Sequence, residues 1–353
     1  MVIENGAGII IRRHKEQHYY TFFNKNTGFF ARIEEENYPE PFWSKNGPEL
    51  LDISITNWCD KSCHICYKNS NKRGKHMTLK NYQLIMQQAK RMGVLQVALG
   101  GGNTNQHPSF IEILKLTRKK YGIIPSYTTN GRGLTEEILK ASQIYCGAVA
   151  VSAYNSIEDI VGVTEILLKN KIKTNIQFVL SNESIEIAIN WLNNIPKYLR
   201  GLNAIIFLNY KPVGKHKSNK LLLNRSKHLE YFFSLIKDKE YPFKIGFDSC
   251  CVSGLVAFLN TNKCFFEACE AARFSAYISE DLYMYPCSFM GESFKGVDLK
   301  HSSIKDCWVD SEIFNNIRSS IKNNSCIANC SKQDICYGGC PVFPKINLCS
   351  NRK

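Results

Sequence analysis

Three cysteines stand close together near the start of the chain, at a spacing typical of metal ligands. Cys59, Cys63 and Cys66 lie within the stretch "NWCDKSCHICYKN". Thiolates bind zinc and iron–sulfur clusters, and such centres usually have four ligands. Three thiolates on one loop therefore leave one coordination position open. His64 or His76 would fill it in a structural zinc site, and a small molecule carrying an amine and a carboxylate would fill it in an iron–sulfur site.

A second group of cysteines occupies the C-terminal part of the chain. Eleven of the fifteen cysteines stand between Cys250 and Cys349. The N-terminal apolar run is too short for a signal peptide, and no window reaches the roughly 18 apolar residues of a membrane span. We therefore expect a cytoplasmic protein without a membrane partner. In that compartment thiols stay reduced, so metal binding is a better explanation of the cysteines than disulfides.

The chain carries an excess of positive charge. Lys and Arg number 45 against 31 Asp and Glu, a formal net charge of +14. Such a surface attracts acidic partners, and an RNA-binding protein of this kind would bind with a steep salt dependence. A Lys- and Asn-rich composition with solvated lysines explains the same excess. No RNA-reading motif is present, so a nucleic-acid partner is not expected.

Strand-like and helix-like runs alternate six times from residue 51 onward. The strand-like runs are rich in β-branched and aromatic residues and stand at 51–58, 94–102, 123–131, 147–154, 173–181 and 203–211. The helix-like runs stand at 79–93, 108–122, 135–145, 157–171, 183–195 and 226–239. Thr135, Asn182 and Ser226 are the expected N-caps of three of them. The alternation predicts a parallel sheet covered by helices, and six units are too few for a closed eight-stranded barrel. We predict an α/β fold built on a partial (β/α)6 barrel.

The flanking segments have different patterns. Residues 1–48 alternate apolar and polar side chains around "NKNTG", which predicts a β-hairpin or small meander. Residues 49–245 form the predicted barrel. Residues 246–353 lose the regular alternation and gain cysteines, which predicts a loop-rich domain stabilised by metal rather than by a large core.

Four polar or flexible features follow four successive strands. The triple-cysteine loop follows the first, "GGGN" at 100–103 ends the second, "TNG" at 129–131 ends the third, and Ser152 lies near the end of the fourth. Because the carboxyl ends of parallel strands share one edge of a sheet, we expect these features to meet at one rim.

The Cys-x3-Cys-x2-Cys loop after the first strand resembles the signature of the radical S-adenosylmethionine enzymes. Ile65 stands where that signature usually has an aromatic residue. The resemblance implies that the three thiolates hold a [4Fe-4S] cluster whose open iron binds the methionine part of S-adenosylmethionine. An electron from the cluster then cleaves the sulfonium, and the resulting 5′-deoxyadenosyl radical abstracts hydrogen from the substrate.

The segment "LGGGNTNQHPSF" resembles the glycine-rich second strand of the same family. Its register aligns Gly101 and Gly102 with two glycines that approach the cofactor, and Asn103 with a glutamate. Asn103 departs from that pattern, because its amide oxygen accepts a hydrogen bond but carries no charge. The resemblance implies further cofactor contacts from Tyr67, Asn130 and Ser152.

The C-terminal cysteines resemble the SPASM extension of radical S-adenosylmethionine enzymes, which holds two auxiliary [4Fe-4S] clusters. The resemblance assigns one cluster to Cys264, Cys269, Cys287 and Cys340, and the other to Cys326, Cys330, Cys336 and Cys349. Cys250 or Cys251 is an alternative to Cys264 or Cys269. Paired cysteines also make zinc ribbons, which is the second interpretation of this region.

The resemblance implies a cytoplasmic enzyme that modifies a ribosomally made precursor peptide. The expected reaction forms a thioether or carbon–carbon crosslink or an oxidised residue, and an electron donor such as flavodoxin or ferredoxin would be a partner. The N-terminal strand edge would bind a leader segment of the peptide by β-augmentation. A sulfatase-maturing enzyme that forms formylglycine is the alternative, although Ser288 stands where that branch has an aspartate that acts as the catalytic base. A non-catalytic metal-binding or RNA-binding protein is the alternative from another class.

Overall fold

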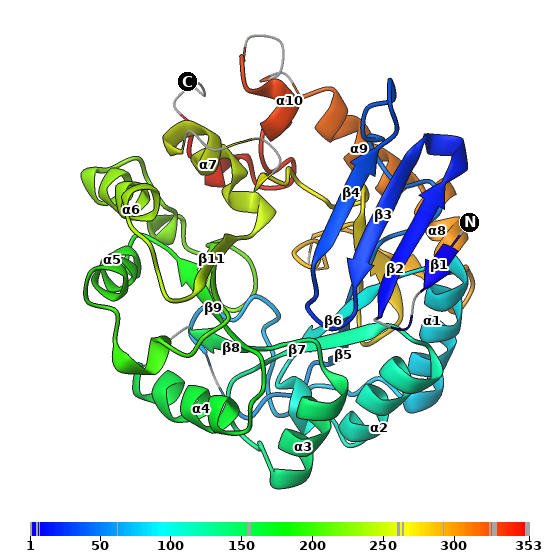
Figure 1. The fold of residues 1–353 in the computed structure, drawn as a ribbon, viewed down its shortest axis with the longest axis horizontal. Coiled ribbons are helices and arrows are strands. Elements are labelled where there is room, and N and C mark those ends of the chain that lie inside the picture. Colours follow the sequence, from blue (N-terminus) through cyan, green and yellow to red (C-terminus); the bar gives the residue numbers. More distant parts are fainter. Residues whose placement is uncertain are drawn as a thin grey trace.

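The computed structural model describes residues 2–4, 6, 8–61, 63–153, 157–259, 262, 265–291, 293–324, 326 and 330–349. Figure 1 shows an arc of helices, from α1 through α6, outside a curved sheet whose strands line the middle of the molecule. The four N-terminal strands form a separate blade beside this sheet, and the C-terminal helices lie at the same end of the molecule as that blade.

The central sheet has ten strands in the order β11-β10-β9-β8-β7-β6-β5-β12-β13-β14. Its six predicted strands are β5 (Leu50–Thr56), β6 (Gln96–Gly101), β7 (Ile124–Thr129), β8 (Val149–Ala153), β9 (Thr174–Leu180) and β10 (Ala204–Asn209). Neighbouring strands from β5 to β10 pair in parallel. Within the described residues the two edge strands, β11 and β14, do not pair with each other. The predicted open, partial barrel is therefore confirmed.

Each predicted helix covers the outer face of this sheet. The helices are α1 (Leu79–Met92), α2 (Phe110–Lys115), which continues as a π-helical turn, α3 (Glu136–Tyr145), α4 (Ile157–Lys169), α5 (Ile185–Asn194) and α6 (Lys227–Asp238). Thr135 and Ser226 cap α3 and α6 through their side chains, as predicted. The prediction for α5 is wrong, because its N-cap is Ser184 and the Asn182 amide instead donates to the carbonyl of Lys220.

Residues before the barrel form a four-stranded antiparallel meander. Its strands are β1 (Val2–Glu4), β2 (Ile9–His14), β3 (Tyr19–Asn24) and β4 (Phe30–Glu34), paired in chain order. The turn between β3 and β4 contains the "NKNTG" stretch, where the Asn24 carboxamide accepts from the backbone of Asn26 and Thr27. The predicted meander is therefore present, with one hairpin at the predicted turn.

The chain beyond the sixth unit returns to the same sheet. Strand β11 (Lys244–Phe247) extends it beside β10, and β12 (Ser275–Ile278) pairs in parallel with β5 on the other side. Strands β13 (Tyr283–Tyr285) and β14 (Val297–Asp298) continue antiparallel from β12. The remaining helices are α7 (Val252–Phe258), α8 (Ile304–Asp310), α9 (Glu312–Lys322) and α10 (Gln333–Cys336). Among the described residues, no helix combines the length and apolar character needed to cross a membrane.

Strand alternation divides β5 between two environments. Leu51, Ile53 and Ile55 are buried in the core that joins the sheet to its outer helices. Successive side chains of a strand point to opposite faces, so Asp52 and Ser54 face the inside of the partial barrel. This inner face carries the polar groups described next.

Candidate active site

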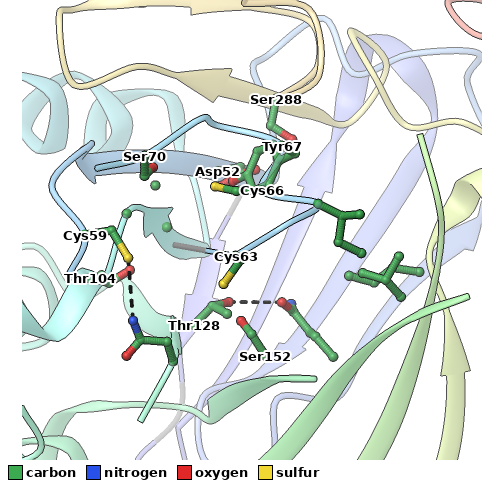
Figure 2. A pocket seen from close by; sticks show the side chains of 18 of the residues that line it. Asp52, Cys59, Cys63, Cys66, Tyr67, Ser70, Thr104, Thr128, Ser152 and Ser288 are labelled. Atoms are coloured by element: carbon green, nitrogen blue, oxygen red, sulfur yellow. Dashed lines mark hydrogen bonds between the residues drawn. The ribbon is translucent and has the colours of Figure 1, made fainter. Parts of the chain in front are cut away.

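The carboxyl ends of the parallel strands surround a cavity of ≈ 280 Å³. Cys59, Cys63 and Cys66 all line it, together with the ends of β6, β7, β8, β9 and β10 (Figure 2). The cavity also takes in predicted cofactor contacts from the loops and strands, namely Tyr67, Gly101, Gly102, Asn130 and Ser152. The predicted convergence of the strand ends on one rim is therefore observed.

The cysteine loop is tied to the end of β7 through Cys59. The Asn130 amide donates to Cys59 Sγ across 3.6 Å and to Asp60 Oδ1 across 3.4 Å. Burial raises the pKa of the Cys59 thiol, so this thiol stays protonated at neutral pH until a metal takes the proton's place. An amide that reaches a sulfur in this way orients the thiol toward the cavity and does not compete for the metal.

Two glycines at the end of β6 allow the cysteine loop to pass close to the sheet. A Cβ on Gly101 would lie 2.0 Å from the carbonyl oxygen of Thr56, and one on Gly102 would lie 2.0 Å from that of Trp58. Gly101 also has a φ of +112°, which favours glycine. Glycine is therefore required at these two positions because they pack closely against the backbone that leads into the cysteine loop. Contact of these glycines with a cofactor stays a prediction.

Gly102→Ala should displace the segment that carries Cys59. Because the clash is with backbone atoms, we expect the free energy of unfolding to fall by about 1–3 kcal/mol. The iron bound after anaerobic reconstitution should also fall. Gly162→Ala is a matched control, because a Cβ there meets nothing within 4 Å. Thermal melting and iron analysis measure both effects, and full iron occupancy in Gly102→Ala would contradict the packing role.

Asn103 lies beside the cavity but is not part of its lining. Its side chain is buried, with the amide nitrogen donating to Gln106 Oε1 at 2.6 Å and to the Arg132 carbonyl at 2.9 Å. Its oxygen accepts from the backbone nitrogen of Asn130 at 3.2 Å. Asn103 therefore joins the end of β6 to the turn after β7, and its predicted contact with a cofactor remains a prediction.

The cavity contains charged residues that were not recognised from the sequence. Lys211, which follows β10, forms an ion pair with Asp248, which follows β11, with Nζ 2.7 Å from Oδ2. Burial lowers the pKa of Lys211, but the nearby carboxylate of Asp248 raises it by more, so the pKa of the lysine lies above its ordinary value. Asp52 also lines the cavity. Asp52 stands among apolar residues of β5. A strand buried on both faces is normally apolar throughout, so this charged residue could have been recognised from the sequence as a candidate site residue.

Three predicted ligands of the first auxiliary cluster lie in the same buried region as Cys250. The Cys250 thiol lies in one buried cluster with Cys340 and interacts electrostatically with Cys269 and Cys287. Burial raises the pKa of the Cys287 thiol to about 12. Cys251 points elsewhere, with Sγ 3.8 Å from the Phe207 carbonyl. Of the two alternatives weighed from the sequence, Cys250 therefore has the better position. Cys264 lies outside the described residues.

The predicted ligands of the second auxiliary cluster line a separate cavity of ≈ 150 Å³. They are Cys326, Cys330, Cys336 and Cys349. Arg225 and Lys332 also border this cavity, so positive charge stands beside the four thiols. A cluster with four thiolate ligands is an anion, and these two side chains would lower the cost of holding it there.

The two histidines that could complete a zinc site have other partners in the structure. His64 stacks on His216 with ring centroids 4.0 Å apart, and His76 Nδ1 hydrogen-bonds Thr56 Oγ1 at 2.9 Å. Within the described ranges, no three His, Cys, Asp or Glu side chains are arranged to hold a single metal ion. The first cavity offers three thiols and open space, a donor set in keeping with a cluster that leaves one iron for a small molecule.

Sequence comparison matches one part of the sheet that surrounds this cavity. Residues 53–152 match the Radical SAM superfamily. A probable GTP 3′,8-cyclase from Pyrococcus horikoshii is 34% identical over 82 residues, which are 23% of this chain and 26% of that protein. The chain thus matches only about a quarter of this curated relative.

Comparison with solved structures extends the similarity to the whole fold. SuiB of Streptococcus suis, in a crystal structure with its precursor peptide SuiA, superposes with a TM-score of 0.75 at 16% identity and covers 99% of this chain and 100% of its own. SuiB bound to S-adenosylmethionine gives 0.74, with 99% of each chain covered. The structure of anSMEcpe with bound AdoMet and the Cp18Cys peptide gives 0.59 at 16% identity, with 82% of this chain and 88% of that chain covered. At this identity the similarity establishes the fold.

The superfamily match covers the segment from β5 to β8, which supplies the three cysteines, the glycine pair and Ser152. These residues meet in one cavity at the carboxyl ends of the strands. The part of the chain that is similar to the Radical SAM superfamily is therefore the part that supplies these residues.

Proposed function

We propose that this protein is a radical S-adenosylmethionine peptide maturase. It cleaves S-adenosylmethionine reductively and abstracts hydrogen from a ribosomally made precursor peptide, which then gains a thioether or carbon–carbon crosslink or an oxidised residue. The observation that carries the proposal is that three cysteines and the glycine end of β6 meet in one cavity, together with the charged residues Asp52, Lys211 and Asp248. The whole-chain similarity to SuiB in complex with a precursor peptide supports a peptide as the substrate class.

Three [4Fe-4S] clusters belong to this proposal. Cys59, Cys63 and Cys66 would hold the one that binds S-adenosylmethionine. The two sets of cysteines in the C-terminal part would hold the auxiliary clusters, which would supply an acceptor for the electron that a substrate radical loses on forming a bond. A small electron-transfer protein such as flavodoxin or ferredoxin would reduce the first cluster, and the reduced thiols agree with a cytoplasmic location.

The outer edge of the N-terminal meander is the proposed docking site for the peptide's leader segment. Strand β4 pairs only with β3 among the described strands, so its other edge has unpaired backbone groups. Ile33 and Phe29 beside this edge are 51% and 60% exposed. Ile33→Lys should weaken peptide binding about tenfold, measured by fluorescence anisotropy, and leave peptide-independent cleavage of S-adenosylmethionine unchanged. Equal affinity in the variant would contradict docking at β4.

Anaerobic reconstitution with iron and sulfide tests the function. The loaded protein, given a strong reductant and S-adenosylmethionine, should yield 5′-deoxyadenosine. With a candidate precursor peptide, mass spectrometry should show a loss of about two mass units for a crosslink or dehydrogenation. Absence of 5′-deoxyadenosine, or zinc in place of iron at the cysteine loop, would contradict the proposal.

Formation of formylglycine in a sulfatase peptide is the second candidate. The similarity to the peptide complex of anSMEcpe supports it, although that similarity spans less of both chains. Conversion of a cysteine or serine of the peptide to an aldehyde, trapped with a hydrazide, would identify this reaction. A crosslink between two side chains would identify the first candidate.

A further inference from the structure

Two carboxylates face the cavity, and they differ in their partners. Asp248 is held by the ammonium group of Lys211 at 2.7 Å. For Asp52, no Lys or Arg of the described residues lies within ion-pair distance. The nearest cation that affects it is Lys68, which is already occupied by the Tyr277 hydroxyl at 2.6 Å and Glu280 Oε2 at 3.2 Å. A carboxylate held by a cation resists protonation, whereas one without such a partner can accept a proton.

Asp52 is positioned so that a substrate in the cavity can reach it. It lies on the inner face of β5, and Ser288 lines the same cavity and stabilises the charged form of its carboxylate. Gly100, on the adjacent strand β6, leaves the space beside it free, because a Cβ there would lie 3.7 Å from Asp52 Oδ1 and 3.9 Å from the Tyr67 hydroxyl. In Figure 2 the side chains of Asp52, Tyr67 and Ser288 gather on the wall of the cavity next to Cys66.

We propose that Asp52 is the proton acceptor of the peptide-modifying reaction, with Ser288 as the residue that positions its carboxylate. This assignment rests on the proposed function. Among the described carboxylates near the cavity, no other has the same combination of access and availability. Asp248 is neutralised by Lys211, and Glu280 accepts hydrogen bonds from both Lys68 and Ser54 Oγ.

The proposed step balances in atoms and electrons. A carbon of the peptide would first lose a hydrogen atom to the 5′-deoxyadenosyl radical that S-adenosylmethionine supplies, and 5′-deoxyadenosine would be the product. As the new bond forms, the peptide radical would lose one proton to a carboxylate oxygen of Asp52, and an auxiliary iron–sulfur cluster held by the C-terminal cysteines would take the remaining electron. The peptide would then have lost two protons and two electrons in total, which together are two hydrogen atoms. Ser288 directly follows Cys287, a predicted ligand of that cluster, so proton and electron acceptors would share one wall of the cavity.

The electrostatic surroundings of Asp52 suit this role. Burial raises its pKa to about 6, and the Ser288 hydroxyl and the charge of Lys68 limit the rise. The other titratable groups that interact with it are Tyr277 on β12 and Cys287 beside Ser288, both of which also have raised pKa values through burial. At neutral pH the carboxylate is ionised, yet it is basic enough to hold a proton transiently.

The Asp52→Asn variant tests proton acceptance separately from peptide binding and hydrogen-atom transfer. The full-length, reconstituted variant is given a candidate precursor peptide that carries deuterium at the reacting carbon. We expect deuterium in 5′-deoxyadenosine at a level within about twofold of the unchanged protein. The modified peptide should fall by about 100-fold, within the range for removal of a general base. Peptide affinity, measured by fluorescence anisotropy on cluster-free protein, should not change.

Two further variants keep the test decisive. Asp281→Asn changes a half-exposed carboxylate outside the cavity and should leave every measurement unchanged. Ser288→Ala keeps the Asp52 carboxylate and removes the hydroxyl that lowers its pKa, so the pH at which product formation rises should shift upward. This variant also provides a result if Asp52→Asn does not fold.

Three results would overturn the assignment, and they are distinguishable. Product formation by Asp52→Asn within threefold of the unchanged protein would remove Asp52 from the chemistry and leave the proposed function intact. Parallel loss of peptide binding, deuterium transfer and product would make Asp52 a binding residue. If the unchanged protein forms 5′-deoxyadenosine but converts no peptide, the proposed function fails and the assignment fails with it.

Discussion

Replacement of Cys59, Cys63 and Cys66 by alanine is expected to abolish formation of 5′-deoxyadenosine. All three thiols line the cavity, and no other described cysteine does. If each of three sites holds a four-iron cluster, the variant should bind about eight of about twelve iron atoms per chain. Iron and sulfide analysis, together with chromatography of the nucleoside product, measures both changes. The polypeptide should still fold, because these side chains belong to a loop outside the apolar core.

Two control variants make this result specific. Cys146→Ala changes a thiol whose pKa burial raises strongly and which lies at the end of α3, far along the chain from every predicted ligand. It should leave iron content and nucleoside formation unchanged. Cys330→Ala alters the second auxiliary site and should lower iron content while 5′-deoxyadenosine is still formed. Equal loss of nucleoside in all three variants would contradict the assignment of the first cavity.

The barrel could be predicted because local pattern and topology agree. Each of the strands β5 to β10 is a short apolar run, and each is followed by a helix with apolar residues at helical spacing. Once the sheet is parallel, the carboxyl ends of its strands must share an edge. This rule alone predicted that Cys59, Gly101, Asn130 and Ser152 would meet, although up to 93 positions separate them in the chain.

The strands after the barrel could not be predicted, because they are short and depend on distant partners. Strand β12 has four residues and β14 has two. Strand β12 gains its place by pairing with β5, more than 200 positions earlier in the chain. Periodicity cannot be read from so few residues, and nothing in the local sequence indicates which strand will be the neighbour.

Charged groups of the cavity were missed for a related reason. The Lys211–Asp248 pair joins the ends of two strands, and neither residue belongs to a motif. The choice between Cys250 and Cys251 as a cluster ligand has the same difficulty. Cys250 is adjacent to Cys340 in space but 90 positions away in sequence, so the spacing of cysteines along the chain gave no reason to prefer it over Cys251. Asp52 is different, because its polar side chain in a doubly buried strand was visible in the sequence.

Arg32→Met should destabilise the folded protein more than Gly102→Ala or any of the cysteine variants. The guanidinium group of Arg32, on β4, is 4% exposed and lies within 4.0 Å of four carboxylates. They are Glu49 at 2.8 Å, Glu270 at 2.7 Å, Glu267 at 3.2 Å and Glu40 at 3.3 Å. Arg32 also lies over the ring of Phe274 at 3.6 Å. These contacts join the meander to the start of the barrel and to the segment before β12.

The size of the effect follows from the charges left behind. Glu49 is buried, and its Oε1 has no hydrogen-bond partner among the described residues. Removing the cation leaves this carboxylate uncompensated, which costs about 3–5 kcal/mol in a buried pair. Arg13→Met is the matched control, because Arg13 pairs with Glu35 at the surface, where solvent screens the interaction. Urea denaturation should show a large decrease in the free energy of unfolding for Arg32→Met and a small decrease for Arg13→Met.

The cost of Arg32→Met should also depend on pH. Burial raises the pKa of Glu49 to about 7 even though Arg32 lowers it, so the variant should raise this pKa further. Between the unfolded pKa of about 4.5 and the higher folded value, the folded state holds a proton that the unfolded state has lost, and stability falls as pH rises. The difference in the free energy of unfolding between the variant and the unchanged protein should therefore be smaller at pH 5.5 than at pH 8. An equal difference at both pH values would mean that Glu49 is not the group left unpaired.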